Sequence, residues 1–140
     1  NAGLNVIFFG CDGLDGILGM DNFDKSLAEG VMLLTPFTPT AKDERTQNFV
    51  KNFTAKYDKA YLNQFGADAY DAIYIIKAAM EKANVTADMD ASAICDALKV
   101  AMTQITFTGV TGTDITWGAD GEPVKKPIAV KIVNGEYVVM

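Results

Sequence analysis

The opening third of the chain contains two apolar runs of strand length. Val6 to Phe9 are four consecutive large apolar residues, two aromatic and two β-branched. Such a run is typical of a strand covered on both faces, as in a parallel sheet flanked by helices. Gly30 to Thr35 form a second run, which Pro36 ends. The two runs predict buried strands of an α/β fold.

The middle of the chain changes to helical spacing. One amphipathic helix is expected within residues 42–62, a second from about Asp68 to Ala83 and a third from about Asp90 to Met102, capped by Asp90 or Ser92. The first would bury an aromatic stripe, and the second would pack a face of small and aliphatic residues closely on a sheet. These faces comprise Phe49, Val50, Phe53, Tyr57, Ala60 and Tyr61 in the first helix, and Ala69, Ala72, Ile73, Ile76, Ala79, Met80 and Ala83 in the second.

The last third of the chain is rich in β-formers and glycine. Residues 106–112 and 113–117 favour short strands. Two further strand-like runs flank Asn134 and Gly135, and Asn-Gly between such runs is the strongest local indication of a β-hairpin. The chain is therefore expected to end in a hairpin.

Composition excludes several classes of function. Eighteen acidic residues against twelve basic ones give a net charge of -6, which argues against a nucleic-acid partner. The chain has no histidine, no phosphate-binding motif and no EF-hand spacing, so we expect no catalytic residues, no metal and no cofactor. Cys11 and Cys95 do not form a Cys-x-x-Cys redox pair. They could form one disulfide if the fold brings them together, but two small buried thiols are expected.

The loop after the first strand carries the candidate chemistry. Asp12 and Gly13 stand at the carboxyl end of that strand, where ligands bind in open α/β sheets. On this stretch alone, the favoured interpretation of Asp12 and Asp15 is that of turn residues whose carboxylates bond their own backbone. Both interpretations of Asp12 remain open.

Several stretches, in order, resemble the type 1 periplasmic binding proteins of the branched-chain amino acid class, the solute receptors of ABC importers. They are FFGCDGLDG, EGVMLLTPFTP, FGADAYDAIYIIKAAMEKA and the tail from Phe107 to Met140. The resemblance implies an incomplete C-terminal fragment of an α/β fold made of three-layer, parallel-sheet lobes, with a C-terminal β-hairpin. It assigns residues 1–35 to part of the C-terminal lobe, 36–118 to part of the N-terminal lobe and 119–140 to a return to the C-terminal lobe. The alternative is that this fragment packs as one compact unit.

The resemblance also assigns residue roles. Asp12 lies where amino-acid-binding members place the carboxylate that pairs with the ligand's ammonium group, and Gly13 lies beside it. Phe65 lies where an aromatic residue lines the ligand side-chain pocket, although a plain core position is the alternative. Thr35, Pro36 and Phe37 correspond to a hinge crossing. Leu14 departs from the family, because many members have an aromatic residue there.

The resemblance implies a binding protein without enzymatic activity. Its ligand would be an amino acid or a similar small polar molecule, and its partner would be an ABC permease. The full-length protein would be periplasmic or extracellular, with a lipid anchor as one option. This fragment is expected to dimerise or exchange elements because its sheet edges are open. The alternative is the ligand-sensing domain of a receptor or regulator with the same fold.

Overall fold

The computed structural model describes residues 3–140 and divides the chain into two compact units. Unit 1 contains Asn1–Gly66 and Pro127–Met140, and unit 2 contains Ala67–Lys126. The C-terminal segment therefore returns to the unit that contains the N-terminal segment. The divisions between the two units fall after Gly66 and after Lys126, whereas the expected lobe boundaries are at residues 35 and 118. The assignment of lobes stays a prediction.

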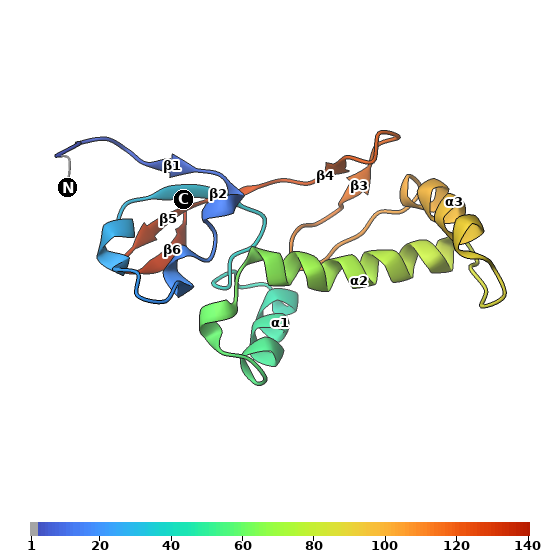
Figure 1. Ribbon diagram of the computed structural model, residues 1–140, viewed down its shortest axis with the longest axis horizontal. Helices are drawn as coiled ribbons and strands as arrows, with labels where there is room; N and C mark the ends of the chain where they lie inside the picture. The colour runs from blue at the N-terminus through green and yellow to red at the C-terminus, as the bar shows by residue number, and fades with distance from the viewer. Residues whose placement is uncertain (1–2) are drawn as a thin grey trace. The chain divides into compact units, whose positions relative to one another are not determined.

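The sheet of unit 1 has four strands in the order β1-β2-β5-β6 (Figure 1). The strands are β1 (Phe9–Gly10), β2 (Met32–Thr35), β5 (Ile128–Val133) and β6 (Glu136–Val139). β1 pairs in parallel with β2, whereas β2–β5 and β5–β6 are antiparallel. The α/β class is confirmed, and the parallel part of the sheet is the β1–β2 pair.

The predicted C-terminal hairpin is confirmed. Asn134 and Gly135 connect β5 to β6 with φ of 53° and 75°. A two-residue turn with both φ values positive matches the twist of the flanking strands. β5 thereby lies beside β2, where Leu33 is the register partner of Val130 and both are fully buried with Ile132 and Ala28. These four residues are the core of unit 1.

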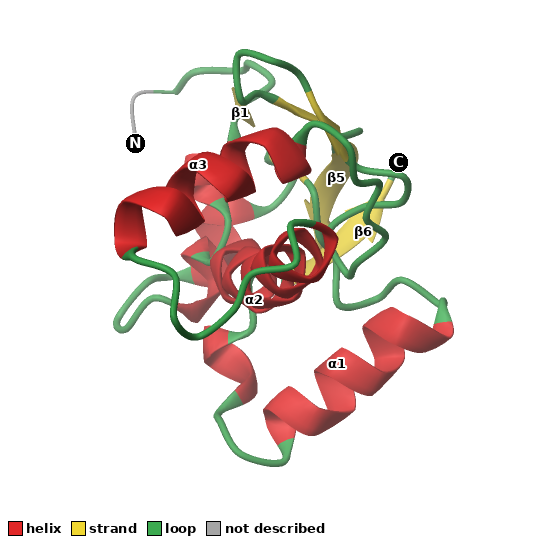
Figure 2. Ribbon diagram, turned by 90° about the vertical axis from the view of Figure 1, so that its right-hand side faces the viewer, coloured by secondary structure: helices red, strands yellow, loops and turns green. Residues whose placement is uncertain are grey.

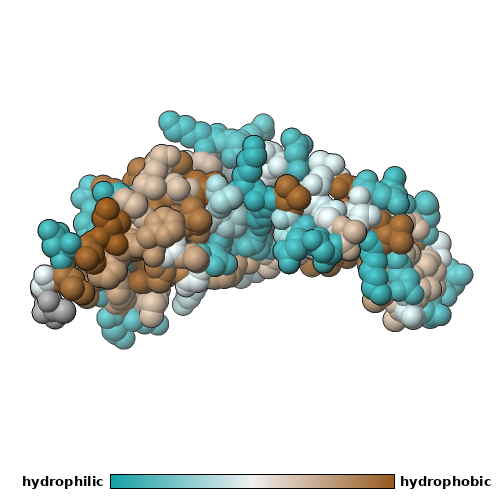
Figure 3. All heavy atoms as spheres, turned by 90° about the horizontal axis from the view of Figure 1, so that it is seen from above, coloured by the Kyte–Doolittle hydropathy of each residue, from teal (hydrophilic) through white to brown (hydrophobic). Residues whose placement is uncertain are grey.

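The first apolar run does not become a covered strand. β1 has only two residues, and Val6, Ile7, Phe8 and Phe9 are all exposed, Ile7 at 76%. β1 is the edge of the sheet, so only one of its sides is paired, and no described element covers the faces of residues 6–9. Hydrophobic side chains accordingly gather on the surface of unit 1 (Figure 3). The sequence predicted the strand type correctly and its burial wrongly.

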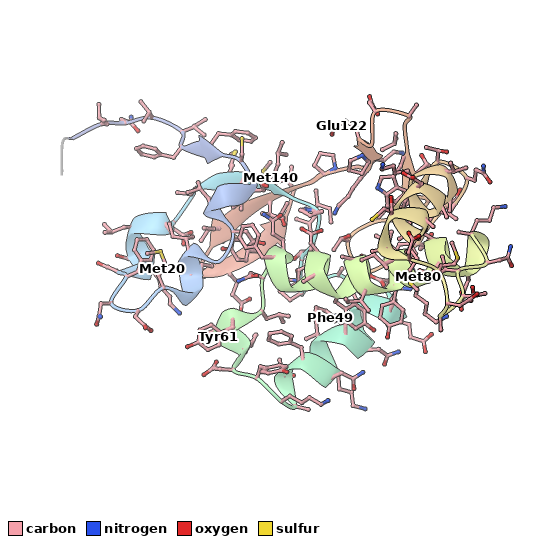
Figure 4. All side chains as sticks on the ribbon, turned by 45° about the vertical axis from the view of Figure 1, so that its right-hand side comes forward. Met20, Phe49, Tyr61, Met80, Glu122 and Met140 are labelled. Atoms are coloured by element: carbon pink, nitrogen blue, oxygen red, sulfur yellow. The ribbon has the colours of Figure 1, made fainter. Side chains whose placement is uncertain are left out.

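The helix expected within residues 42–62 is shorter than predicted. α1 (Glu44–Thr54) is capped by Asp43, whose carboxylate accepts a bond from the Thr46 amide. A turn separates α1 from the 3₁₀ helix η4 (Lys59–Tyr61). Only part of the aromatic stripe is core. Phe49 is buried, with its ring centroid 5.6 Å from that of Phe37, whereas Tyr61 in η4 is exposed (Figure 4).

Unit 2 consists mainly of two helices. α2 (Gln64–Lys82) starts at the end of unit 1 and continues through unit 2, and α3 (Ala91–Met102) follows it. Figure 2 looks down α2 and shows α3 running across the view. Asp90 is the N-cap of α3, because its carboxylate accepts the Ala93 amide at 2.8 Å. Strands β3 (Thr116–Trp117) and β4 (Pro123–Val124) pair antiparallel.

The buried face of α2 differs from the predicted one. Ala79 is buried as expected, but Ile73 is 67% exposed, and Ile76 and Met80 are also exposed (Met80 is labelled in Figure 4). The helix instead buries Ala67 and Asp71. The periodicity identified an apolar face correctly, but the described part of unit 2 has only two short strands and no sheet covers that face.

A buried carboxylate holds unit 2 together. Asp71 is 2% exposed and accepts bonds from the Val110 amide at 3.0 Å, the Thr111 amide at 2.8 Å and the Thr111 hydroxyl at 2.7 Å. The carboxylate thereby ties the loop before β3 to the middle of α2. Three donors compensate for the removal of this charge from water.

Replacing Asp71 should destabilise unit 2. Asp71→Ala leaves three buried donors without an acceptor, so we expect a loss of about 3 kcal/mol in the free energy of unfolding. Asp71→Asn keeps one acceptor oxygen and should lose about half as much. Urea unfolding followed by fluorescence of Trp117, the single tryptophan, reports on this unit.

The matched control is Lys77→Ala, which removes an exposed i,i+4 ion pair with Glu81 on the same helix. This change should alter the free energy of unfolding by no more than about 0.5 kcal/mol. Equal stabilities of the Asp71→Ala and Lys77→Ala variants would contradict the assigned role of Asp71.

The two cysteines are free and exposed, so the expected burial of both thiols is wrong. Cys11 lies in the turn after the uncovered edge strand, and Cys95 lies on α3 away from the inward positions Ile94 and Leu98. Because both sulfurs are accessible, a native chain should react with two equivalents of a chromogenic disulfide reagent as fast as the urea-unfolded chain does. One slow thiol in the native chain would contradict this exposure.

Candidate functional site

A short turn presents the first candidate residues. The 3₁₀ helix η1 (Asp12–Leu14) follows β1, and its geometry is set by backbone bonds from Leu14 to Cys11 and from Asp15 to Asp12. One oxygen of the exposed Asp12 carboxylate accepts the Gly13 amide at 3.0 Å. No other bond to this carboxylate occurs within residues 3–140. The turn role of Asp12 is therefore present, and its second carboxylate oxygen remains accessible.

A buried polar network fixes this turn against the start of α2. The Gln64 side-chain amide donates to the Asp12 carbonyl at 2.8 Å, and the Gln64 backbone amide donates to the Asp15 carboxylate at 2.8 Å. The Gln64 side-chain oxygen lies 3.2 Å from the Thr35 hydroxyl. Gln64 therefore joins the turn, the end of β2 and α2. Sequence reasoning missed Gln64 altogether and gave Asp15 only a turn role.

The network brings the predicted ligand residues to one edge of unit 1. Phe65 follows Gln64 directly and is 51% exposed, so it does not occupy a core position in this structure. Gln64 is bonded to the carbonyl of Asp12, and Gly13 comes next in the turn. Asp12, Gly13 and Phe65 consequently belong to adjoining segments, with Leu14 exposed beside them. A carboxylate and an aromatic ring on such an edge suit a small cationic group with an apolar body.

Two of the three predicted hinge residues are buried in unit 1, and Pro36 between them is half-buried. Thr35 and Phe37 are 3% and 2% exposed, and the Thr35 hydroxyl donates to the Phe37 carbonyl at 2.9 Å. This bond turns the chain at Pro36, which cannot extend the β2 ladder. Both sides of the crossing belong to unit 1. A hinge role for these three residues stays a prediction.

The sequence and fold of the chain match a known family. The family profile described as "Periplasmic binding protein" matches residues 3–136. This chain belongs to the periplasmic binding protein family. The expected resemblance is confirmed over nearly the whole chain, and the family consists of substrate-binding proteins rather than enzymes. No curated relative matches the chain.

Solved structures share the fold of this periplasmic binding protein. An ABC transporter substrate-binding protein from Desulfitobacterium hafniense in complex with Leu has a TM-score of 0.74 and 21% identity. The branched-chain amino acid transporter substrate-binding protein of Streptococcus pneumoniae in complex with isoleucine has a TM-score of 0.73 and 23% identity. A solute-binding protein from R. palustris in complex with benzoate has a TM-score of 0.75 and 19% identity.

The match covers almost all of this chain and a minor part of each neighbour. It spans 99% of this chain and 36% and 38% of the first two structures, and 96% and 35% for the third. This periplasmic binding protein chain therefore corresponds to little more than a third of those proteins. Within residues 3–140, no helix is long and apolar enough to cross a membrane, and no three metal-ligating side chains cluster.

The pKa of the Asp15 carboxyl in unit 1 is raised above its ordinary value. Burial raises its pKa above 3.8, and bonds from the Gln64 and Gly16 amides and the Thr35 hydroxyl offset only part of that rise. Burial and the adjacent Asp15 charge also raise the pKa of Tyr137, whose hydroxyl lies 3.2 Å from the Gly16 amide. Asp15 is thus a partly buried carboxylate with a structural role, rather than an exposed group available to a ligand.

The stability of unit 1 should depend on the ionisation of Asp15. The folded pKa exceeds the unfolded one, so the unfolded chain loses its proton first as the pH rises from 3.8 toward the folded value. The free energy of unfolding should therefore fall across that window, relative to an Asp15→Asn variant, and then stay level. Urea unfolding followed by circular dichroism from about pH 3.5 to about pH 7 measures the difference.

A carbon NMR titration of the Asp15 carboxyl supplies the direct check. Its midpoint should lie above 3.8, because burial penalises the ionised form. An Asp15 midpoint below 3.8, or a wild-type advantage over Asp15→Asn that grows with pH, would show that burial does not raise the pKa of this carboxyl.

Proposed function

We propose that this chain is part of a solute-binding protein that binds an amino acid or a similar small polar molecule. The observation that carries the proposal is the family match over residues 3–136, together with an accessible carboxylate on a fixed turn. Asp12 binds the ligand ammonium, the Gly13 backbone approaches the ligand closely, and Phe65 covers its apolar part. Binding closes two lobes about Thr35, Pro36 and Phe37 and involves no chemical step.

Pre-organisation supports this role for Asp12. The Gln64 side chain holds the backbone of the Asp12 turn, and the Gly13 amide orients one oxygen of the Asp12 carboxylate before the ligand arrives. A carboxylate–ammonium bond in a closed cleft is charge-assisted and strong. The leucine and isoleucine complexes of the structural neighbours carry the same ammonium group, whereas the benzoate complex does not. The exposed Leu14 at this edge favours an apolar ligand body.

We also propose the setting of the whole protein. It delivers its ligand to an ABC permease from a periplasmic or extracellular position, with a lipid anchor in the complete chain. A ligand-sensing domain of a receptor is the other role open to this fold, and a permease-dependent uptake assay separates the two. The exposed apolar residues 4–9 beside the edge strand support dimerisation or strand exchange of the 140-residue chain.

Asp12→Ala is the test of the ligand site. In the whole protein that carries these residues, the variant leaves the ligand ammonium buried without its partner. We expect a loss of about 2–5 kcal/mol, or at least about thirtyfold in Kd. Isothermal titration calorimetry with the amino acid that gives the largest thermal shift measures it. The isolated chain should bind that amino acid weakly, because a one-sided pocket cannot desolvate its guest.

Asp21→Ala is the matched control, since Asp21 is another exposed aspartate of unit 1 in a turn outside the candidate edge. Its Kd should stay within about twofold of the wild-type value. A change below about threefold for Asp12→Ala would remove Asp12 from the site, and absence of any thermal shift across the common amino acids would remove the ligand class.

A further inference from the structure

Unit 1 contains a cavity that the proposed ligand edge does not use. Its volume is about 310 Å³, and residues from five separate segments line it. They include the 3₁₀ helices η2 (Ile17–Gly19) and η3 (Lys25–Ala28), the stretch after the predicted hinge, η4 and the C-terminal hairpin. Asp12, Gly13 and Phe65 are not among the lining residues. This volume is at the lower end of the range for small-molecule sites.

Contacts between the lining residues themselves join the walls of the cavity. A Cβ atom at Gly19 would overlap the Ala60 carbonyl oxygen, so the backbones of η2 and η4 approach as closely as only glycine allows. The Tyr137 hydroxyl lies 3.2 Å from the Gly16 amide and joins the hairpin to the turn before η2. The buried Leu62 ends η4 and contributes an apolar wall. These contacts join three of the five lining segments to one another.

The charges that line the cavity are mainly positive. Lys25 comes from η3 and Lys59 from η4, so two exposed lysines 34 positions apart in sequence line one cavity. Neither forms an ion pair within residues 3–140. Glu136 is the only carboxylate of the lining. This local excess of positive charge contrasts with the net charge of -6 for the chain.

We infer that this cavity binds a small organic carboxylate. The carboxylate group lies between Lys25 and Lys59, and its apolar body contacts Leu18, Leu62 and the ring of Tyr137. Two ammonium donors from different elements outweigh the single Glu136 carboxylate, so an anion is favoured over a cation. The site is separate from the proposed amino-acid edge and does not rest on that proposal.

Hexanoate is the probe, because it has one carboxylate and an unbranched apolar body. Titrated into the 140-residue chain, it should shift the backbone NMR signals of Gly16, Gly19, Ala60 and Gly135, with a Kd on the order of 1 mM. The double variant Lys25→Gln/Lys59→Gln should weaken binding about fivefold, a modest factor because both lysines are exposed. Higher salt should weaken hexanoate binding to the wild type as well.

Two controls make the test decisive. Lys51→Gln/Lys56→Gln removes the same charge from exposed positions outside the cavity and should leave the hexanoate Kd unchanged. Hexanamide, which has the same shape without the charge, should bind at least about fivefold more weakly. The inference is overturned if hexanoate shifts none of these signals, if hexanamide binds equally well, or if both double variants weaken binding alike. A dispersed spectrum for each variant establishes that it is folded.

Discussion

A carboxylate removed from water must find donors nearby, and in unit 1 this constraint falls on Asp15. Its oxygens accept the Gln64 amide from the start of α2 and the Gly16 amide from its own turn, within reach of the Thr35 hydroxyl. Tyr137 approaches the same group from the C-terminal hairpin. Segments from the beginning, middle and end of the chain thus meet at one charge. The position of the Asp12 turn and of Phe65 depends on that meeting.

In unit 2, the buried Asp71 carboxylate likewise accepts hydrogen bonds from backbone amides of a distant segment. Each carboxylate sits on or beside a turn of helix and binds backbone amides of a segment that is distant in sequence. Hydrogen bonds from amides are directional, so they fix the loop more closely than apolar contacts would. Both units therefore use an aspartate that accepts backbone amides to position a loop, Asp15 partly buried and Asp71 fully buried. Within residues 3–140 no buried side-chain nitrogen or oxygen lacks a partner.

Two sets of exposed apolar side chains lie on faces that α/β proteins usually cover. The faces of residues 6–9 and of α2 around Ile73 are typical of buried elements in an α/β protein, yet neither has cover among the described residues of this chain. The chain spans little more than a third of the structures that share its fold. In general, exposed apolar faces favour association with another surface, because burying them releases ordered water.

Local chemistry was readable from the sequence, whereas burial and long-range pairing were decided only by the tertiary structure. The cap at Asp90, the two helices that follow α1, the strand ending at Pro36 and the Asn134–Gly135 turn each depend on neighbouring residues alone. A period of hydrophobic residues identifies a face but not what covers it, so the first strand, the α2 face and both cysteines were expected to be buried and are exposed. Gln64 carries no recognisable motif, and its role arises because residues 52 and 29 positions away come within hydrogen-bonding distance. The sequence by itself determined most of the helices and the C-terminal hairpin, since these follow from local backbone bonding, whereas the strand expected over 106–112 formed only an isolated bridge between Phe107 and Ile115. Tertiary contacts decided which side chains meet.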